Sequence, residues 1–143
     1  MRRLLLLPVL SAFVIACGGN STTAPTPVTP PPTNIAGNWT GTFTFTPTSG
    51  GQRQILAVTA TFTQGSDNIT GQVNIAGGGT ALLSGIVSAT TLTASTTMTV
   101  NNCSGSASVS GSVSATQVRW TVPTLATSGT CSFFTSGDFL LSR

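Results

Sequence analysis

Apolar and polar residues alternate in the stretch GNWTGTFTFT, which spans residues 37–46. Trp39, Gly41, Phe43 and Phe45 occupy odd positions, and threonine occupies every even position from 40 to 46. Because successive side chains of a β-strand point to opposite faces, this period of two predicts a strand with one buried and one exposed face. The stretch therefore indicates a half-buried antiparallel sheet.

The same period of two continues from Ile35 to Arg143, and no segment of any length has helical periodicity. Turn-forming residues at 47–51, 65–68 and 77–79 separate the alternating segments. Seven further strands are predicted, at residues 56–62, 69–75, a segment ending near 87, and then 92–100, 105–113, 118–122 and 137–141.

An internal repeat supports a series of hairpins. The segment SGIVSATTL at 84–92 recurs as SGSVSATQV at 110–118, and each copy contains the end of a strand, a turn and the start of the next strand. In each copy the glycine shares a face with the apolar residue two places further on. Small and large residues then alternate on the inward face, as in a coiled or tapering barrel. The inward glycines leave space, which favours a cavity.

Eight strands with short connections in about 110 residues predict an all-β fold. We expect an eight-stranded antiparallel up-and-down meander, closed into a small barrel that forms one domain at 35–143. Closure removes the exposed strand edges, which this chain has almost no charge to protect.

A membrane-spanning barrel is the competing β architecture, and three features oppose it. The predicted strands are mostly shorter than the roughly 9 to 11 residues that a tilted span requires. Two tryptophans and no tyrosine cannot form aromatic girdles, and the chain ends in Arg143 rather than an aromatic residue. We therefore expect the apolar faces to point inward.

Gly37-Asn38-Trp39 at the start of the first strand resembles the Gly-x-Trp opening of lipocalins and avidins, in which the tryptophan plugs one end of the barrel. The lipocalin pattern also stacks an arginine on that tryptophan, a role that Arg143 or Arg119 could fill. The chain lacks a later lipocalin signature and the polar set with which avidins hold biotin. The resemblance therefore implies the barrel architecture and no particular ligand.

The first 17 residues have the pattern of an export signal. Arg2 and Arg3 precede an apolar run at 4–15, which is too short to span a membrane, and Ala16 precedes Cys17. This ending resembles the lipobox of bacterial lipoproteins. The resemblance implies a signal peptide at 1–16, cleavage before Cys17 and a diacylglycerol on the Cys17 thiol. The alternative is an ordinary secretory signal with an incidental cysteine.

Residues 17–34 form a lipidated tether in this interpretation. The segment is rich in Pro, Thr and Ser and has little to bury, so we expect a disordered chain with polyproline II character. Gly18 is not the aspartate that retains lipoproteins in the inner membrane, so the resemblance implies anchoring in the cell envelope at the outer membrane.

Cys103 and Cys131 are the two cysteines that remain, and an exported protein favours disulfides. We therefore predict that they are bonded to each other. A redox or metal-binding pair is the alternative, but structural zinc sites use four ligands and the chain has no histidine.

Charge and composition exclude several functions. After residue 16 the chain has three arginines against two aspartates, a net side-chain charge of +1, which cannot form a basic patch for nucleic acid. The sequence contains no His, Lys, Tyr or Glu, so acid–base chemistry would fall on Asp67 in a turn and Asp138 on an outward strand position. We expect no enzyme activity, no metal and no cofactor.

Two functional classes remain. The first, which we favour, is a structural or surface-interaction lipoprotein, whose aromatic residues fill the core and whose exterior contacts other envelope proteins. The second is a barrel whose mouth binds a small apolar ligand. We expect Trp39 to be a structural plug and Trp120 to lie where the barrel opens. The residues that would line the mouth are Trp39, Phe43, Met98, Trp120 and Phe139.

Overall fold

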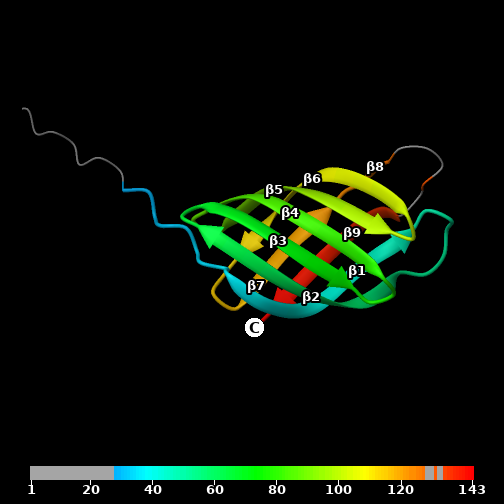
Figure 1. Cartoon of the computed structure of the whole chain (residues 1–143), viewed down its shortest axis with the longest axis horizontal. Helices are drawn as coiled ribbons and strands as arrows, with labels where there is room; N and C mark the ends of the chain where they lie inside the picture. The colour runs from blue at the N-terminus through cyan, green and yellow to red at the C-terminus, as the bar shows by residue number, and fades with distance from the viewer. Residues whose placement is uncertain (1–27, 128–130, 132–133) are drawn as a thin grey trace, which may run out of the picture.

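The computed structural model describes residues 28–127, 131 and 134–143. The predicted signal peptide, Cys17 and most of the predicted tether lie outside this range. The described residues form nine β-strands, which Figure 1 shows from end to end. The strands are β1 (Gly37–Pro47), β2 (Gln54–Gly65), β3 (Asn68–Ile75), β4 (Gly79–Ser88), β5 (Thr91–Val100), β6 (Cys103–Val113), β7 (Gln117–Val122), β8 (Ala126–Thr127) and β9 (Phe134–Ser142).

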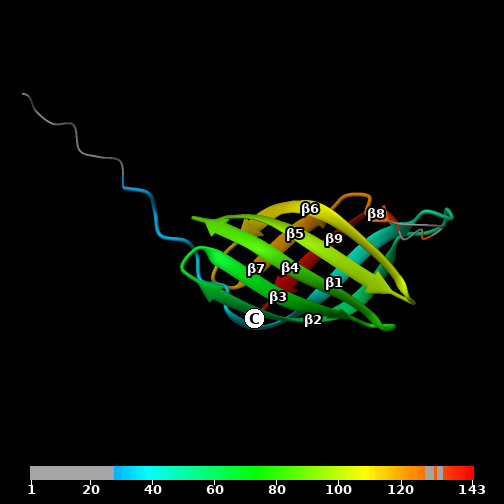
Figure 2. The same cartoon turned by 45° about the horizontal axis from the view of Figure 1, so that its top comes forward.

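Eight of these strands close into an antiparallel up-and-down barrel, as the sequence predicted. Each strand from β1 to β6 pairs with the next, β7 pairs with β9, and β9 pairs back with β1. Figure 2 shows the strands curling around a common axis. The eight predicted strands correspond to β1–β7 and β9. The two-residue strand β8, which pairs with Gly105 and Ser106 of β6, was not predicted.

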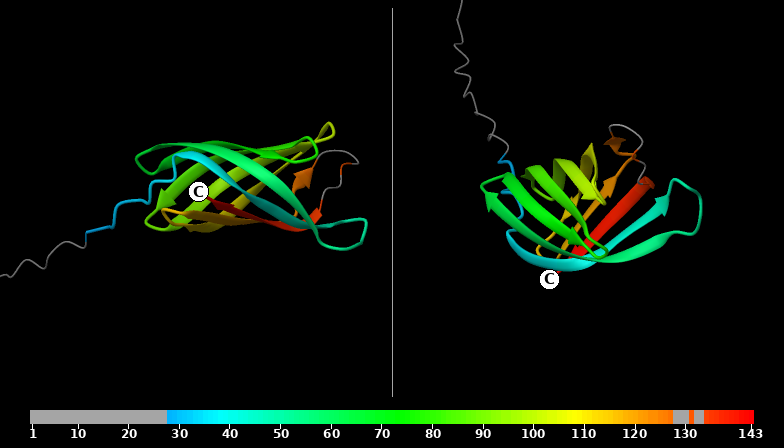
Figure 3. Two further views of the ribbon diagram at one scale, coloured as in Figure 1. Left: turned by 90° about the horizontal axis from the view of Figure 1, so that it is seen from below. Right: turned by 45° about the vertical axis from the view of Figure 1, so that its right-hand side comes forward.

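The two ends of the barrel differ, and we name them here. The closed end is where β1 begins and β9 ends, together with the turns after β2, β4 and β6. The open end is where β1 ends and β9 begins, together with the turns after β3 and β5. The N-terminal segment reaches the barrel at the closed end, near the C-terminus (Figure 3).

The inward faces carry the predicted apolar residues. On β1 the buried positions include Trp39 and Phe43, and on β5 Leu92, Ala94 and Met98 are buried. The outward faces are formed mainly by threonine and serine. This arrangement places apolar side chains inside and hydroxyl groups outside, the reverse of the lipid-facing pattern of a membrane-spanning barrel.

The strand-length argument against a membrane span was wrong. Strands β1, β2, β4, β5, β6 and β9 contain 9 to 12 residues, since the alternation extends beyond the apolar residues that mark it in the sequence. The inward placement of the apolar side chains is therefore the observation that still opposes a membrane span. Across the described part of the chain there is no helix with the length and apolar character of a membrane span.

The inward glycines do not create the space expected from the sequence. A Cβ at Gly41 would overlap the carbonyl oxygen of Leu140, and a Cβ at Gly111 would overlap that of Arg119. Glycine is needed at these positions because the neighbouring strand approaches too closely for a side chain. At Gly71 the place of a side chain is taken by the Phe62 ring, and at Gly137 it is taken by the Phe43 ring.

The structure joins Cys103 to Cys131 as a disulfide, with 5.6 Å between the two Cα atoms. Cys103 begins β6, and Cys131 lies in the connection between β8 and β9, so the bond is at the open end. The Thr127 hydroxyl donates a hydrogen bond of 2.9 Å to the carbonyl oxygen of Cys131. The bond therefore ties the β8–β9 connection to the barrel wall.

Reduction of this disulfide is expected to lower the free energy of unfolding by at most about 3.5 kcal/mol, because the bond constrains a loop of about 29 residues in the unfolded chain. Unfolding should stay cooperative, since the barrel core does not depend on the bond. Urea titrations of the exported protein with and without dithiothreitol measure both effects. A variant with alanine at both Cys103 and Cys131 is the control, and should not respond to the reductant. Free thiols at both positions in the untreated exported protein would contradict the prediction.

Candidate functional site

Trp39 seals the closed end of the barrel. Its side chain is 1% exposed, and its indole Nε1 donates a hydrogen bond of 2.8 Å to the carbonyl oxygen of Ile35. The Arg143 guanidinium lies over the ring, with Cζ 4.4 Å from the ring centroid, in the geometry of a cation–π contact. Of the two arginines that the sequence offered for this position, Arg143 stacks on the ring. Arg119 is exposed on β7.

Arg143 also holds the N-terminal segment against the barrel. Its guanidinium donates hydrogen bonds to the carbonyl oxygens of Ala36 at 2.9 Å and Asn34 at 3.2 Å, and its Nε donates to that of Ala115 at 2.8 Å. Arg143, the residue after β9, therefore connects the N-terminal segment, the turn between β6 and β7 and the Trp39 ring.

Gln64 provides a second clamp on the same segment. Its side-chain oxygen accepts a hydrogen bond of 2.8 Å from the Ile35 amide, and its Nε2 donates to the carbonyl oxygens of Thr33 and Ser66. The Thr33 amide donates in turn to the carbonyl oxygen of Ala89. Ile35 is fully buried, so residues 33–36 lie across the closed end and complete it.

Four aromatic rings form a continuous stack through the barrel interior. Trp120 stacks on Phe139 with 4.5 Å between ring centroids, Phe139 stacks on Phe43 at 4.3 Å, and Phe43 stacks on Phe45 at 5.0 Å. Trp120 is 1% exposed, so the expectation that it lies where the barrel opens was wrong. Its indole Nε1 has no hydrogen-bond partner among the described residues, and its ring meets that of Phe62 edge to face.

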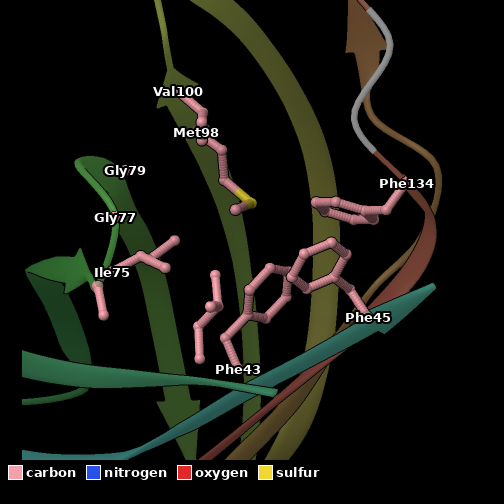
Figure 4. Close-up of a pocket in the computed structure, with 10 residues that line it drawn as sticks. Phe43, Phe45, Ile75, Gly77, Gly79, Met98, Val100 and Phe134 are labelled. Carbon is pink, nitrogen blue, oxygen red and sulfur yellow. The ribbon is translucent and has the colours of Figure 1, made fainter. Parts of the chain in front are cut away.

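An apolar cavity of about 300 Å³ lies at the open end, where the ring stack ends. Figure 4 shows Phe43, Phe45 and Phe134 on one side of it and Ile75 and Met98 on the other. Its volume falls at the lower end of the range typical of small-molecule sites. The lining residues are Phe43, Phe45, Leu56, Ile75, Ala76, Gly77, Gly79, Met98, Val100 and Phe134.

The cavity contains two of the five candidate ligand residues. Phe43 and Met98 line it, whereas Trp39, Trp120 and Phe139 are buried in the core and are not part of the lining. Most of the lining residues that the sequence did not indicate lie further along the same inward faces, at the strand ends that meet at the open end, while Ala76 and Gly77 belong to the turn after β3. The alternation in the sequence predicts that the lining side chains on these strands face inward. It does not indicate which end of the barrel contains the cavity.

The turn after β3 forms one edge of the mouth. Gly77 and Gly78 have φ angles of +95° and +92°, a conformation that residues with a side chain rarely adopt. The Gly78 amide donates a hydrogen bond to the carbonyl oxygen of Ile75, which closes the turn. This tight connection bends the chain back at the edge of the cavity.

Neither aspartate lines the cavity. Asp67 is in the turn between β2 and β3 at the closed end, where it accepts a hydrogen bond from the Asn68 amide group. Asp138 is on the outer face of β9, where it accepts hydrogen bonds from Arg53 and Thr121. Within the described residues no group of three acidic, cysteine or histidine side chains could hold a metal ion. The arrangement favours binding of apolar groups.

Comparison of the chain with models of protein families, with curated proteins and with solved structures found no match.

Proposed function

We propose that this chain is a lipid-anchored protein of the bacterial cell envelope whose barrel binds a small apolar or amphipathic molecule at its open end. The observation that carries this proposal is the apolar cavity beside Phe43, Phe45 and Met98. A cavity lined by aromatic, aliphatic and thioether side chains gains free energy by removing apolar ligand surface from water.

Two features of the sequence and the fold support the wider proposal. The lipobox-like segment ending at Cys17 supports lipid attachment and export to the envelope, with the outer membrane as the expected location. The eight-stranded barrel, sealed by Trp39 beneath the Arg143 guanidinium, is compatible with a lipocalin-like architecture. We propose no catalytic activity and no cofactor for the barrel.

A variant that fills the cavity tests the binding proposal. Leu56 faces inward at the start of β2 and lines the cavity, so Leu56→Trp should occupy the space a ligand needs. We expect the full chain in lipid nanodiscs to bind the apolar fluorophore N-phenyl-1-naphthylamine, and the variant to lose at least about tenfold in affinity. Fluorescence titration against empty nanodiscs measures the binding.

The matched control is Ile55→Trp, which adds the same side chain one residue earlier. Ile55 is 67% exposed on the outward face, so this variant should bind the fluorophore like the original chain. Equal binding by the original chain and Leu56→Trp would contradict the proposed site. Failure of a wider panel of apolar compounds to bind would contradict ligand binding itself.

A structural or surface-interaction role is the second candidate. It is favoured by the complete burial of Trp39, Trp120 and Phe139, since these rings fill the barrel instead of lining the mouth. In this alternative the threonine- and serine-rich exterior contacts envelope proteins. Leu56→Trp would then leave the function of the protein unchanged, whereas substitutions on the outward strand faces would impair it.

A further inference from the structure

The side chains that line the cavity offer no partner to a polar group of a ligand. All ten lining residues are apolar or glycine, and none has a side chain that could form a conventional hydrogen bond with a headgroup. Burying a charged or strongly polar group without a partner costs several kcal/mol. An amphipathic ligand should therefore insert its apolar part and leave its headgroup at the mouth.

A polar pocket lies on the outer side of the same wall. Thr44, Thr46, Ser136, Arg53 and Asp138 line it together with Phe45, which also lines the apolar cavity. Arg53 immediately precedes β2 at the open end. The wall residue Phe45 thus borders an apolar site on one side and a guanidinium-bearing site on the other.

The charges of the barrel are few, and their positions single out Arg53. Within the described part of the chain, Arg143 lies at the closed end. Arg119 lies on β7 opposite Ser112, one residue before β6 ends at the closed end. Arg53 is consequently the cation that a headgroup at the open end would meet.

The contact of Arg53 with Asp138 is weak enough for the guanidinium to leave this carboxylate and pair with another anion. A single pair of atoms, Arg53 Nη2 and Asp138 Oδ2, is 3.3 Å apart, and the two side chains are 63% and 34% exposed. Exposed ion pairs of this kind contribute little to stability. Asp138 also accepts a hydrogen bond of 2.8 Å from the Thr121 hydroxyl, so it keeps a partner when Arg53 turns towards the mouth.

We propose that the ligand is a single-chain anionic amphiphile whose apolar chain enters the cavity and whose carboxylate pairs with Arg53 at the rim. This inference rests on the proposed binding function and specifies the ligand class. Arg53 recognises the headgroup, and the apolar lining recognises the chain. A guanidinium suits this role because it presents several donors to a carboxylate.

The test compares two ligands with the same chain, dodecanoate and dodecan-1-ol. Binding of each to the full chain in lipid nanodiscs is measured by equilibrium dialysis, with empty nanodiscs subtracted. We expect dodecanoate to bind more tightly than the alcohol. Arg53→Gln should lower the affinity for dodecanoate about threefold to fivefold, the range of an exposed ion pair, and leave the affinity for the alcohol unchanged.

Two further variants make the test specific. Asp138→Asn removes the competing carboxylate and should raise the affinity for dodecanoate alone, because Arg53 is then freed. Arg119→Gln removes an exposed arginine away from the mouth and should change neither affinity. Equal binding of the two ligands, or equal effects of Arg53→Gln on both, would overturn the headgroup assignment while leaving apolar binding intact. Binding of neither ligand would overturn both this assignment and the proposed function.

Discussion

Replacing Trp39 by alanine is expected to lower the free energy of unfolding by about 3 to 5 kcal/mol, the usual cost of truncating a buried tryptophan. The ring is 1% exposed, so its removal leaves a cavity at the closed end. The Ile35 carbonyl also loses the indole hydrogen bond, and the Arg143 guanidinium loses the ring over which it lies. Urea unfolding of the exported protein, followed by circular dichroism, measures the change.

Two variants act as controls for this prediction. Trp39→Phe keeps an aromatic ring beneath Arg143 but removes the indole N–H, so it should cost less than the alanine variant. Ile55→Ala shortens an exposed apolar side chain and should change stability by no more than about 0.5 kcal/mol. A loss below about 1 kcal/mol for Trp39→Ala would show that this ring does not seal the barrel.

Replacing Cys17 by serine is expected to abolish membrane association, because the proposed lipid is attached to the Cys17 thiol. Cys17 lies outside the described residues, and within the described part of the N-terminal segment the first backbone hydrogen bond to the barrel is that of Thr33. The variant should therefore retain the circular dichroism spectrum and unfolding transition of the original chain. Membrane fractionation and metabolic labelling with a palmitate analogue measure the effect.

The remaining cysteines provide the control. Replacing Cys103 and Cys131 by alanine should leave membrane association and lipid labelling intact, because these residues lie at the open end of the barrel. Full membrane partitioning of Cys17→Ser would contradict the lipoprotein proposal.

The strands could be predicted from the sequence because the alternation is a local property. Thr40 and Thr42 point outward and Phe43 points inward because successive side chains of a single pleated strand alternate between its two faces. The two-residue strand β8 has no such signal, because Ala126 and Thr127 are fixed by pairing with β6. The inward glycines were visible, but their role depends on how closely the neighbouring strands approach.

The candidate site was less predictable than the fold because it depends on contacts between residues that are far apart in the sequence. Inward parity selects Phe43, Met98 and Trp120 equally, but it does not say which end of the barrel is filled. The closed end is completed by residues 33–36, which have no strand pattern, and by Arg143 from the other terminus of the domain. Trp120 is buried against the rings of Phe62 and Phe139, which come from distant strands and which the alternation does not reveal.

The clamp on residues 33–36 fixes the end of the barrel at which the N-terminal segment joins it. The chain joins the barrel at the end opposite the mouth, so the point of attachment and the entrance are separated by the length of the strands. For a chain anchored through Cys17, the tether would therefore leave the domain on the side away from the entrance. A ligand that approaches from the surrounding water would then meet the entrance without passing the tether.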